Sequence, residues 1–351
     1  MKKIFFSLVA LAALAACSKS EVEYTDNMEL SLAPVTRLNT KAAVDGTDYP
    51  DDLNMFVFAN AAEPTAALPA GYTEPYFANA EFTTDRDDIT LADHVFAGVT
   101  PYYWPNVKQL KFAGFSKSGN ATGTNASYSV NGDKITITDY TPGEGANDLM
   151  YFPATAAYGK DTDFVPVTMY HTCSWITFLV KGDDVTANST YQVTGLTITG
   201  IDNNATVACG TCADVDDVAT AVVWGGTTGD NENAKTATLA VTLDDDLDVL
   251  TTDAINVETA EEYALADGGN VVVIPQVPGK LTLSYTYESS TGAIITEEVE
   301  GIDLKIDANP VVNVWEPGKH YIYTITIKAN EILIAPSAGD WTDSNHNITV
   351  E

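Results

Sequence analysis

Residues 321–327 read Tyr-Ile-Tyr-Thr-Ile-Thr-Ile, and residues 281–287 read Leu-Thr-Leu-Ser-Tyr-Thr-Tyr. In both stretches large apolar side chains stand at every second position, and an extended chain places such residues on one face of a sheet. Helical periodicity is weak throughout, while Thr, Val, Ile and Tyr are abundant and turn residues separate the apolar runs. The sequence therefore predicts an all-β fold whose sheets pack in pairs to bury their apolar faces.

Further strand patterns are spread over both halves of the chain. The clearest are residues 53–58, 110–115, 134–138, 174–180 and 191–198. The composition turns polar around residues 158–163, which indicates a domain boundary, and residues 202–236 are typical of an acidic loop. We expect two β-sandwich domains in tandem, over residues 38–160 and 161–351.

The chain is strongly acidic. It has 49 acidic and 17 basic residues and a net charge of −32. Such a charge repels nucleic acids and anionic membranes, so a nucleic-acid-binding function is excluded. Its only arginines are Arg37 and Arg86, so clusters that clamp phosphate groups are not expected either.

The first residues have the pattern of an export signal. Lys2 and Lys3 precede an apolar run over Ile4–Ala16, which ends in Leu-Ala-Ala before Cys17. This predicts a lipoprotein signal peptide over residues 1–16 and acylation of the Cys17 thiol; the alternative is an ordinary export signal with a chance cysteine. The run is shorter than the roughly 20 apolar residues that a membrane-spanning helix needs, so the lipid is the expected membrane anchor.

Residues 17–37 look like a propeptide that contains one strand. Met28, Leu30 and Leu32 alternate with polar residues, and Arg37-Leu38 follows shortly after them. An arginine-specific protease would find one favourable site there, because the other arginine is flanked by aspartates. Cleavage between Arg37 and Leu38 would free the strand. The alternative is that Arg37 is simply a solvated linker residue.

The remaining cysteines carry no clear chemistry. Cys173 lies in a strand-like run and is expected to be a small buried apolar residue. Cys209 and Cys212 form a CxxC motif without the helix of a redox motif and without the second pair of a zinc site. We expect a small loop disulfide between them, which an exported compartment permits.

No catalytic, cofactor or metal site emerges from the motifs. His94, His171, His320 and His346 are scattered and form no ligand pair. The acidic run Asp244–Asp248 lacks the spacing of a calcium loop and fits a solvated turn. The sequence therefore favours a protein that is not an enzyme, with no cofactor and no metal.

Several stretches resemble one known family. They are, in chain order, Leu14–Cys17 with Ser18-Lys19-Ser20-Glu21, Tyr103-Trp104-Pro105, Asp148-Leu149-Met150-Tyr151, Val165-Pro166-Val167, Val273-Ile274-Pro275-Gln276 and Trp315–Tyr323. Each stretch is weak alone, but together they span nearly the whole chain in the order of the fimbrillin family, the subunits of type V pili. The chain is thus similar to a surface fimbrial subunit.

The resemblance implies a fold and an assembly mechanism. It implies an outer-membrane lipoprotein precursor with two transthyretin-like β-sandwich domains. An arginine-specific protease then removes the strand around Met28, Leu30 and Leu32. A C-terminal segment of the next copy, or of another fimbrial subunit, fills the vacated place and builds an adhesive surface filament. The donor maps to the tail 331–351, where Ile332, Ile334, Ile348 and Val350 are the candidate apolar anchors.

Two alternatives remain open from the sequence. The ten residues after Trp341, with only Ile348 and Val350 as alternating apolar anchors, could be the last strand of their own sandwich, in which case the chain is a tip or accessory subunit. The main rival function is a surface-anchored glycan-binding lipoprotein, which would expose Trp and Tyr side chains on one face.

We expect Cys17→Ala to abolish fatty-acid labelling of the precursor and to release it from membranes, because the thiol is the acyl acceptor. Metabolic labelling and membrane fractionation measure both effects. Cys212→Ala is the matched control and should keep the label. Undiminished labelling of Cys17→Ala would contradict the lipoprotein assignment.

Overall fold

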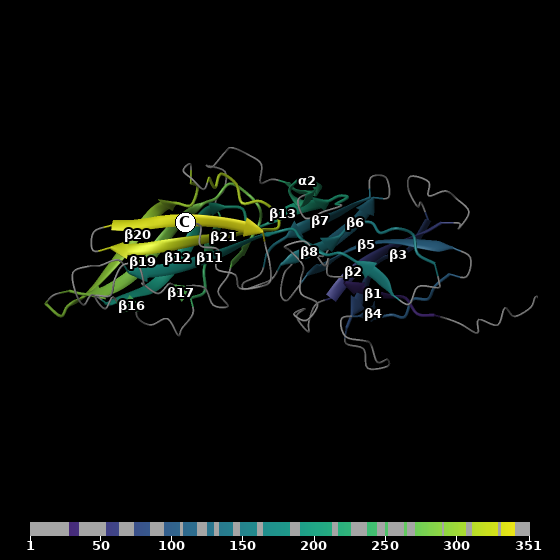
Figure 1. Cartoon of the computed structure of the whole chain (residues 1–351), viewed down its shortest axis with the longest axis horizontal. Coiled ribbons are helices and arrows are strands. Elements are labelled where there is room, and N and C mark those ends of the chain that lie inside the picture. Colours follow the sequence, from purple (N-terminus) through teal and green to yellow (C-terminus); the bar gives the residue numbers. More distant parts are fainter. Residues whose placement is uncertain are drawn as a thin grey trace, which may run out of the picture.

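A computed structural model describes the ranges 28–34, 54–62, 74–84, 95–105, 108–117, 125–129, 133–142, 148–159, 164–182, 190–212, 217–225, 237–243, 250–251, 263–264, 271–289, 291–306, 311–328 and 331–340. Within these ranges the regular structure is almost entirely β, with one short helix, α2 (Val218–Ala221). The predicted all-β fold is therefore confirmed. The strands form two elongated lobes that lie end to end (Figure 1). No helix among the described residues is long and apolar enough to cross a membrane.

The first lobe is built on an eight-stranded sheet with the order β10-β8-β5-β2-β3-β4-β1-β9. Its strands are β1 (Ser31–Pro34), β2 (Asn54–Ala62), β3 (Glu74–Thr83), β4 (Phe96–Gly98), β5 (Gln109–Lys117), β8 (Leu149–Phe152), β9 (Val165–Val167) and β10 (Tyr170–His171). The two outermost strands, β9 and β10, are separated in the chain only by Thr168 and Met169. The sheet must therefore curl back on itself, so that β4, β1 and β9 face the central strands across a core.

A second, four-stranded sheet of the first lobe combines segments from both halves of the chain. Its order is β14-β13-β7-β6, with β6 (Asn125–Ser129), β7 (Lys134–Tyr140), β13 (Ala205–Cys209) and β14 (Val222–Gly225). β13 pairs with β7 in an antiparallel ladder that includes Cys209 opposite Ile135. Residues 202–236, expected to be loop, thus contain two strands. The boundary expected at residue 160 does not separate the sheets, because β9, β10, β13 and β14 all join the first lobe.

The central strands of the first lobe bury both of their faces. In β8, Met150 and Phe152 belong to one apolar cluster while Leu149 and Tyr151 belong to another. We call the first cluster the slot core; it includes Leu30, Leu32, Met55, Val57, Phe82, Phe96, Phe112 and Val165. The second, the outer core, lies against the four-stranded sheet and includes Phe58, Phe115, Ile135, Ile137, Val207 and Trp224. Alternate side chains of one strand therefore stabilise two separate cores.

The second lobe is a sandwich of two sheets around one core. One sheet has the order β17-β11-β21-β22 with β18 also on β11, and the other has the order β15-β12-β19-β20 with β16 also on β12. The bounds are β11 (Ser174–Gly182), β12 (Thr190–Ile201), β15 (Ala237–Ala240), β16 (Leu250–Thr251), β17 (Tyr263–Ala264), β18 (Val271–Val273), β19 (Lys280–Glu288), β20 (Ile294–Asp303), β21 (Lys319–Lys328) and β22 (Glu331–Asp340).

The alternating stretches that predicted the fold form the middle of this sandwich. Leu281 and Leu283 of β19, and Tyr323 and Ile325 of β21, are fully buried in the second-lobe core. Trp315 lies beside them, and its indole N–H donates to the Tyr323 hydroxyl at 2.9 Å. The period of two was therefore a correct signal in both strands. That the domains are transthyretin-like stays a prediction.

Hydrogen bonds link the two lobes at the joint, the segment where β10 is followed by β11. Thr172, Cys173 and Ser174, which connect β10 to β11, are fully buried. The indole N–H of Trp224, on β14 of the first lobe, donates to the Thr172 carbonyl at 2.8 Å. The Ser174 hydroxyl donates to the Glu316 carbonyl of the second lobe, also at 2.8 Å. The connection is thus a packed segment rather than a free linker.

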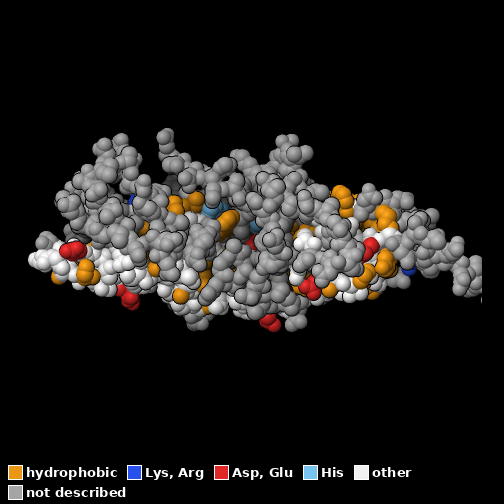
Figure 2. All heavy atoms as spheres, turned by 90° about the horizontal axis from the view of Figure 1, so that it is seen from below, with side chains coloured by type: hydrophobic (Ala, Val, Ile, Leu, Met, Phe, Trp, Pro, Cys, Tyr) orange, Lys and Arg blue, Asp and Glu red, His pale blue; other side chains and the backbone are white. Residues whose placement is uncertain are grey.

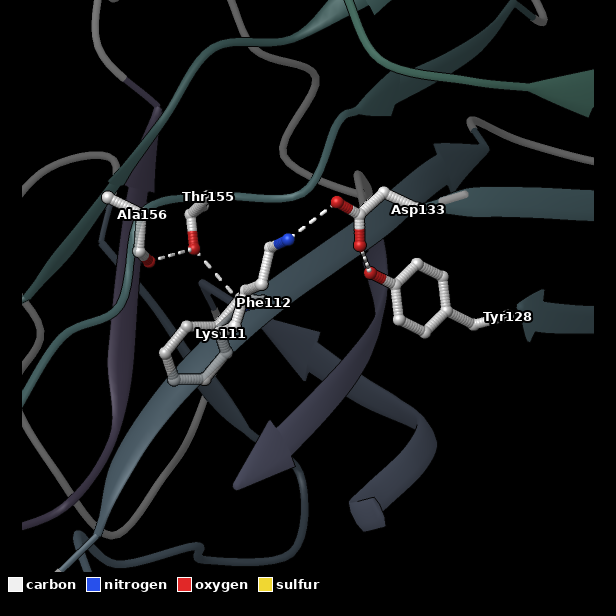
Figure 3. A network of polar contacts seen from close by, with 6 residues as sticks. All are labelled: Lys111, Phe112, Tyr128, Asp133, Thr155 and Ala156. Carbon is white, nitrogen blue, oxygen red and sulfur yellow. Dashed lines mark hydrogen bonds and ion pairs between the residues drawn. The ribbon is translucent and has the colours of Figure 1, made fainter. Parts of the chain in front are cut away.

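A polar network ties the sheets of the first lobe together (Figure 3). Lys111 of β5 reaches Asp133 in the β6–β7 turn at 2.6 Å, and the Tyr128 hydroxyl donates to the same carboxylate at 2.8 Å. Burial, and then the neighbouring Asp133, raise the pKa of Tyr128. On the opposite side of β5, the backbone N–H of Phe112 donates to the Thr155 hydroxyl at 3.1 Å. The contacts of Asp133 fix the turn of the outer sheet against the central one, and the contact of Thr155 fixes the segment after β8 beside β5.

Close packing between the central strands gives a direct test of the fold. A Cβ on Gly114 would lie 2.4 Å from the Phe152 ring and 2.8 Å from the Phe56 carbonyl oxygen. We expect Gly114→Ala to destabilise the chain by about 1–3 kcal/mol, because the added carbon meets backbone and a buried ring. Chemical denaturation measures this. Gly159→Ala is the control, since a Cβ there would meet nothing within 4 Å; equal stability of the two variants would refute the packing.

Candidate functional site

The strand predicted to be removable is an interior strand of the first lobe. β1 pairs with β4 in antiparallel direction, with Leu32 opposite Phe96, and with β9 in parallel direction, with Leu32 opposite Val165. Just before β1, the Leu30 N–H donates to the Tyr102 carbonyl at 2.8 Å. We call the place that residues 28–34 occupy between β4 and β9 the β1 slot.

The apolar side chains of this segment belong to the slot core. Leu30 and Leu32 are 0% exposed, and the neighbouring Ala33 is 8% exposed. Met28 is partly buried against the same cluster. The predicted alternation is therefore present, although the regular strand begins at Ser31 rather than at Met28. The position of these side chains makes β1 part of the core and not a surface addition.

β1 precedes every other described strand of the lobe in the chain. β1 ends at Pro34 and the next described strand, β2, begins at Asn54. Arg37 and Leu38 lie in this connection and outside the described residues. A single cut in the connection would leave β1 held only by hydrogen bonds and packing. The geometry of a removable strand requires such a connection.

The candidate donor anchors lie partly within the second lobe. β22 is an edge strand that pairs with β21 along its whole length, placing Ile332 opposite Ile327 and Ile334 opposite Ile325. The other two anchors, Ile348 and Val350, lie outside the described residues. β22 is thus the last described strand of this sandwich, and the tail after Trp341, to which the alternative expectation applied, lies outside the described residues. An edge strand has only one hydrogen-bonded neighbour, so its release disturbs one ladder.

The loop disulfide expected in the first lobe is not formed in the structure. None of the three described cysteines, Cys173, Cys209 and Cys212, is part of a disulfide. Cys209 ends β13 with its side chain in the outer core, where burial raises the pKa of its thiol. Cys212 is only partly buried beside the same core. The strand geometry therefore directs Cys209 into apolar packing, which the sequence reasoning did not anticipate; Cys17 lies outside the described residues.

Two histidines make specific contacts within the fold. Asp148 contacts the His171 Nδ1 through its Oδ2 at 2.5 Å, which joins β10 to the residue before β8. His320 stacks on Trp175 with ring centroids 4.9 Å apart and shares a hydrogen bond of 2.8 Å with the Thr177 hydroxyl. Burial lowers the pKa of His320 to about 4, so its ring is neutral at pH 7. Sequence spacing could not find either pair, because the partners meet only through strand pairing.

The described residues contain no group of three or more His, Cys, Asp or Glu that could hold a metal ion. His94, His346 and the run Asp244–Asp248 lie outside them.

Within the described ranges the aromatic residues do not form a broad exposed face. Trp104, Trp224 and Trp315 are all buried. Tyr76 and Tyr103 are 39% and 40% exposed, and the Tyr76 hydroxyl donates to the Tyr103 carbonyl at 2.6 Å. These two tyrosines lie beside the β1 slot, since Tyr103 forms an isolated bridge with Glu29.

Comparisons with known proteins agree with this architecture. The model of a family described as fimbrillin-like matches residues 40–341, and the model of a prokaryotic membrane lipoprotein lipid attachment site matches residues 1–18. No curated protein matches the chain.

Solved structures of similar proteins cover nearly the whole chain. A fimbrial protein from Bacteroides vulgatus ATCC 8482 matches with a TM-score of 0.53 and 16% identity, over 90% of this chain and 99% of that one. A putative cell adhesion protein from Bacteroides ovatus ATCC 8483 matches with a TM-score of 0.46 and 14% identity, over 91% and 99%. The C-terminally truncated tip fimbrial protein Mfa3 from Porphyromonas gingivalis has a TM-score of 0.33 and 9% identity, over 89% and 100%. At 16% identity, the first match shows a shared fold.

Truncation of the buried leucines tests the role of β1 in the core. We expect Leu30→Ala and Leu32→Ala each to lower the free energy of unfolding by about 2–5 kcal/mol, because both leave a cavity in the slot core. Chemical denaturation of the uncleaved chain measures this. Val223→Ala is the control, as Val223 is 52% exposed on β14. Leucine variants as stable as the control would exclude β1 from the core.

Proposed function

Because the chain belongs to the fimbrillin-like family, we propose that it is a pilin that polymerises by replacement of β1 with a strand of the next subunit. The family consists of structural fimbrial subunits rather than enzymes, and the lipid attachment site makes the chain a membrane-anchored surface lipoprotein. Beyond family membership and lipid anchoring, we propose three further steps: cleavage of the chain, replacement of β1 and assembly into an adhesive filament. We also propose that Cys17 carries the lipid and that this lipid anchors the precursor in the outer membrane.

One observation carries the proposal. Leu30 and Leu32 of the β1 segment are fully buried, and residues 35–53 join this segment to β2, the next described strand. That connection contains Arg37, and the other arginine, Arg86, stands between Asp85 and Asp87. Cleavage after Arg37 therefore separates an interior strand from the lobe without cutting any other described strand.

Loss of β1 would leave backbone groups without partners and open apolar pockets, and both favour binding of a replacement strand. In the order of the sheet, β1 is the link between β4 and β9, so both strands would lose backbone partners. Two leucine-sized pockets would open in the slot core, each worth about 1.5–3 kcal/mol when filled. A strand with apolar side chains at alternate positions satisfies both the backbone groups and the pockets.

The C-terminal segment has the properties of such a strand. Ile332 and Ile334 stand two residues apart in the edge strand β22, and Ile348 and Val350 repeat this spacing in the tail. Side chains two residues apart point to the same face, as those of Leu30 and Leu32 do. A donor at one end of the chain and a slot near the other make a head-to-tail contact, which produces an open filament. The donor partner is another copy or another fimbrial subunit.

We expect limited digestion with an arginine-specific protease to give a new N-terminus at Leu38 and polymer ladders that resist boiling in detergent. Arg37→Ala should fold and be exported but should remain monomeric, since β1 cannot leave its slot. N-terminal sequencing and gel electrophoresis measure both. Arg86→Ala is the matched control and should form normal ladders.

Other results of these experiments would lead to different conclusions. Normal ladders from Arg37→Ala would refute the cleavage site. Cleavage without ladders would identify a tip or accessory subunit. A chain that resists cleavage at Arg37 would favour the surface-anchored glycan-binding lipoprotein.

A further inference from the structure

Exposed apolar side chains border the β1 slot at one end. Tyr76 and Tyr103 are 39% and 40% exposed, and Val99 is 53% exposed. We call these three residues the mouth patch. Hydrophobic side chains are visible on the surface of the first lobe, at the right of Figure 2.

Strand pairing places the mouth patch beside the beginning of the slot. Tyr103 bridges Glu29, whereas Leu32 further along the slot pairs with Phe96. The hydroxyl of Tyr76, a residue of β3, donates a hydrogen bond to the Tyr103 carbonyl. Both tyrosines therefore lie at the end of the slot that Met28 occupies. The patch is therefore next to the point where any strand running in the direction of β1 must enter.

The direction of a replacement strand follows from its neighbours. β1 is antiparallel to β4 and parallel to β9. A donor restores both ladders in their existing form only if it runs in the same direction as β1. Its first residues then lie at the mouth patch, and the body of the subunit that supplies it must lie on that side.

The donor begins at the far end of the second lobe. β11 leaves the joint at Ser174, and β21 runs parallel to it, with Gly182 opposite Ile327. β21 therefore ends, and β22 begins, at the end of the lobe remote from the joint, on the left of Figure 1. The β19–β20 turn lies at the same end, because β19 passes from Lys280 beside Thr199 to Tyr287 beside Tyr191. We call this end the distal pole.

The distal pole carries an exposed apolar side chain of its own. Ile294, the first residue of β20, is 70% exposed and is paired with Glu288 just after the turn. Copies of a chain with a net charge of −32 repel one another, so close contact requires surfaces without like charges. The mouth patch and Ile294 supply uncharged side chains at the two places that the donor strand brings together.

We propose that the mouth patch docks against the distal pole of the next copy of this chain, with Ile294 of that copy in contact with Tyr76 and Tyr103. This inference rests on the proposed strand replacement, because the donor strand determines which ends meet. The occupant of the patch is thus a second subunit. The docked surfaces orient the donor as it enters and cover the mouth once it is in place.

Two assays on protease-cleaved chains separate this inference from the proposed function. The first measures binding of a synthetic peptide with residues 331–351, which needs only the slot. The second measures the rate of polymerisation of whole chains, which needs the slot and the docking surface. The variants are Tyr103→Ser at the mouth and Ile294→Ser at the pole, and Val311→Ser, at a 58% exposed residue away from both, is the control.

We expect both docking variants to bind the peptide as the parent does but to polymerise about tenfold more slowly or worse. Val311→Ser should polymerise normally. Mixing Tyr103→Cys chains with Ile294→Cys chains should give a bismaleimide-linked dimer that neither chain gives alone. Ile294→Ser keeps the test valid if Tyr103→Ser disturbs the adjoining strand, since Ile294 packs little against its own lobe.

The outcomes are distinguishable. A parent chain that fails to bind the peptide would overturn the strand replacement itself. Peptide binding together with normal polymerisation of both variants would overturn the docking surface and leave the strand replacement standing. Variants that polymerise normally but lose adhesion to immobilised glycans would assign the tyrosines to sugar binding and would also overturn the inference.

Discussion

The first lobe depends on the pairing of β1 with β4 and β9. Through this one short strand, β9 is joined to the sheet and the slot core is closed. Leu30 and Leu32 fill the centre of that core without any exposed surface. A strand whose apolar side chains are buried in the core can be exchanged only if the rest of the lobe keeps its shape when the strand is absent.

The two-sided central strands supply that property. β5 and β8 direct Phe112 and Phe152 into the slot core, but they direct Phe115 and Tyr151 into the outer core, which lies against β7 and β13. Opening the slot exposes only the first set. If β1 leaves as proposed, the outer core and the contact of Lys111 with Asp133 would keep their partners, so the central strands would stay positioned to receive a new neighbour. The separation of the two cores thus allows one of them to be open for a time.

The sequence predicted the elements whose side chains alternate strictly and whose partners lie close by. Leu281, Leu283, Tyr323 and Ile325 face one core as their spacing indicated. The pattern at Leu30 and Leu32 likewise identified β1, since both of these buried positions carry large side chains. Strong local patterns of this kind depend little on the rest of the chain.

Features that depend on distant contacts were missed. β13 has the sequence Ala-Thr-Val-Ala-Cys, whose small side chains give a weak strand signal, but it is paired on both sides, with β7 and with β14. Because β13 and β14 join the first lobe, the boundary expected at residue 160 does not separate the sheets. For the same reason Cys209 lies in the outer core and not in a loop disulfide. The contact of Asp148 with His171 also arises from pairing between β8 and β10. No local window of the sequence contains this information.

The crossing of β13 and β14 into the first lobe also has a mechanical meaning. In a filament built by the proposed strand replacement, tension would enter each subunit through the donor strand at one end and leave through the strand at the other. Because β13 is connected to β12 of the second lobe and lies along β7 of the first, a pull that separates the lobes loads the β7–β13 hydrogen bonds together with the joint at Thr172–Ser174. The subunit then bears force through parallel connections rather than through a single hinge.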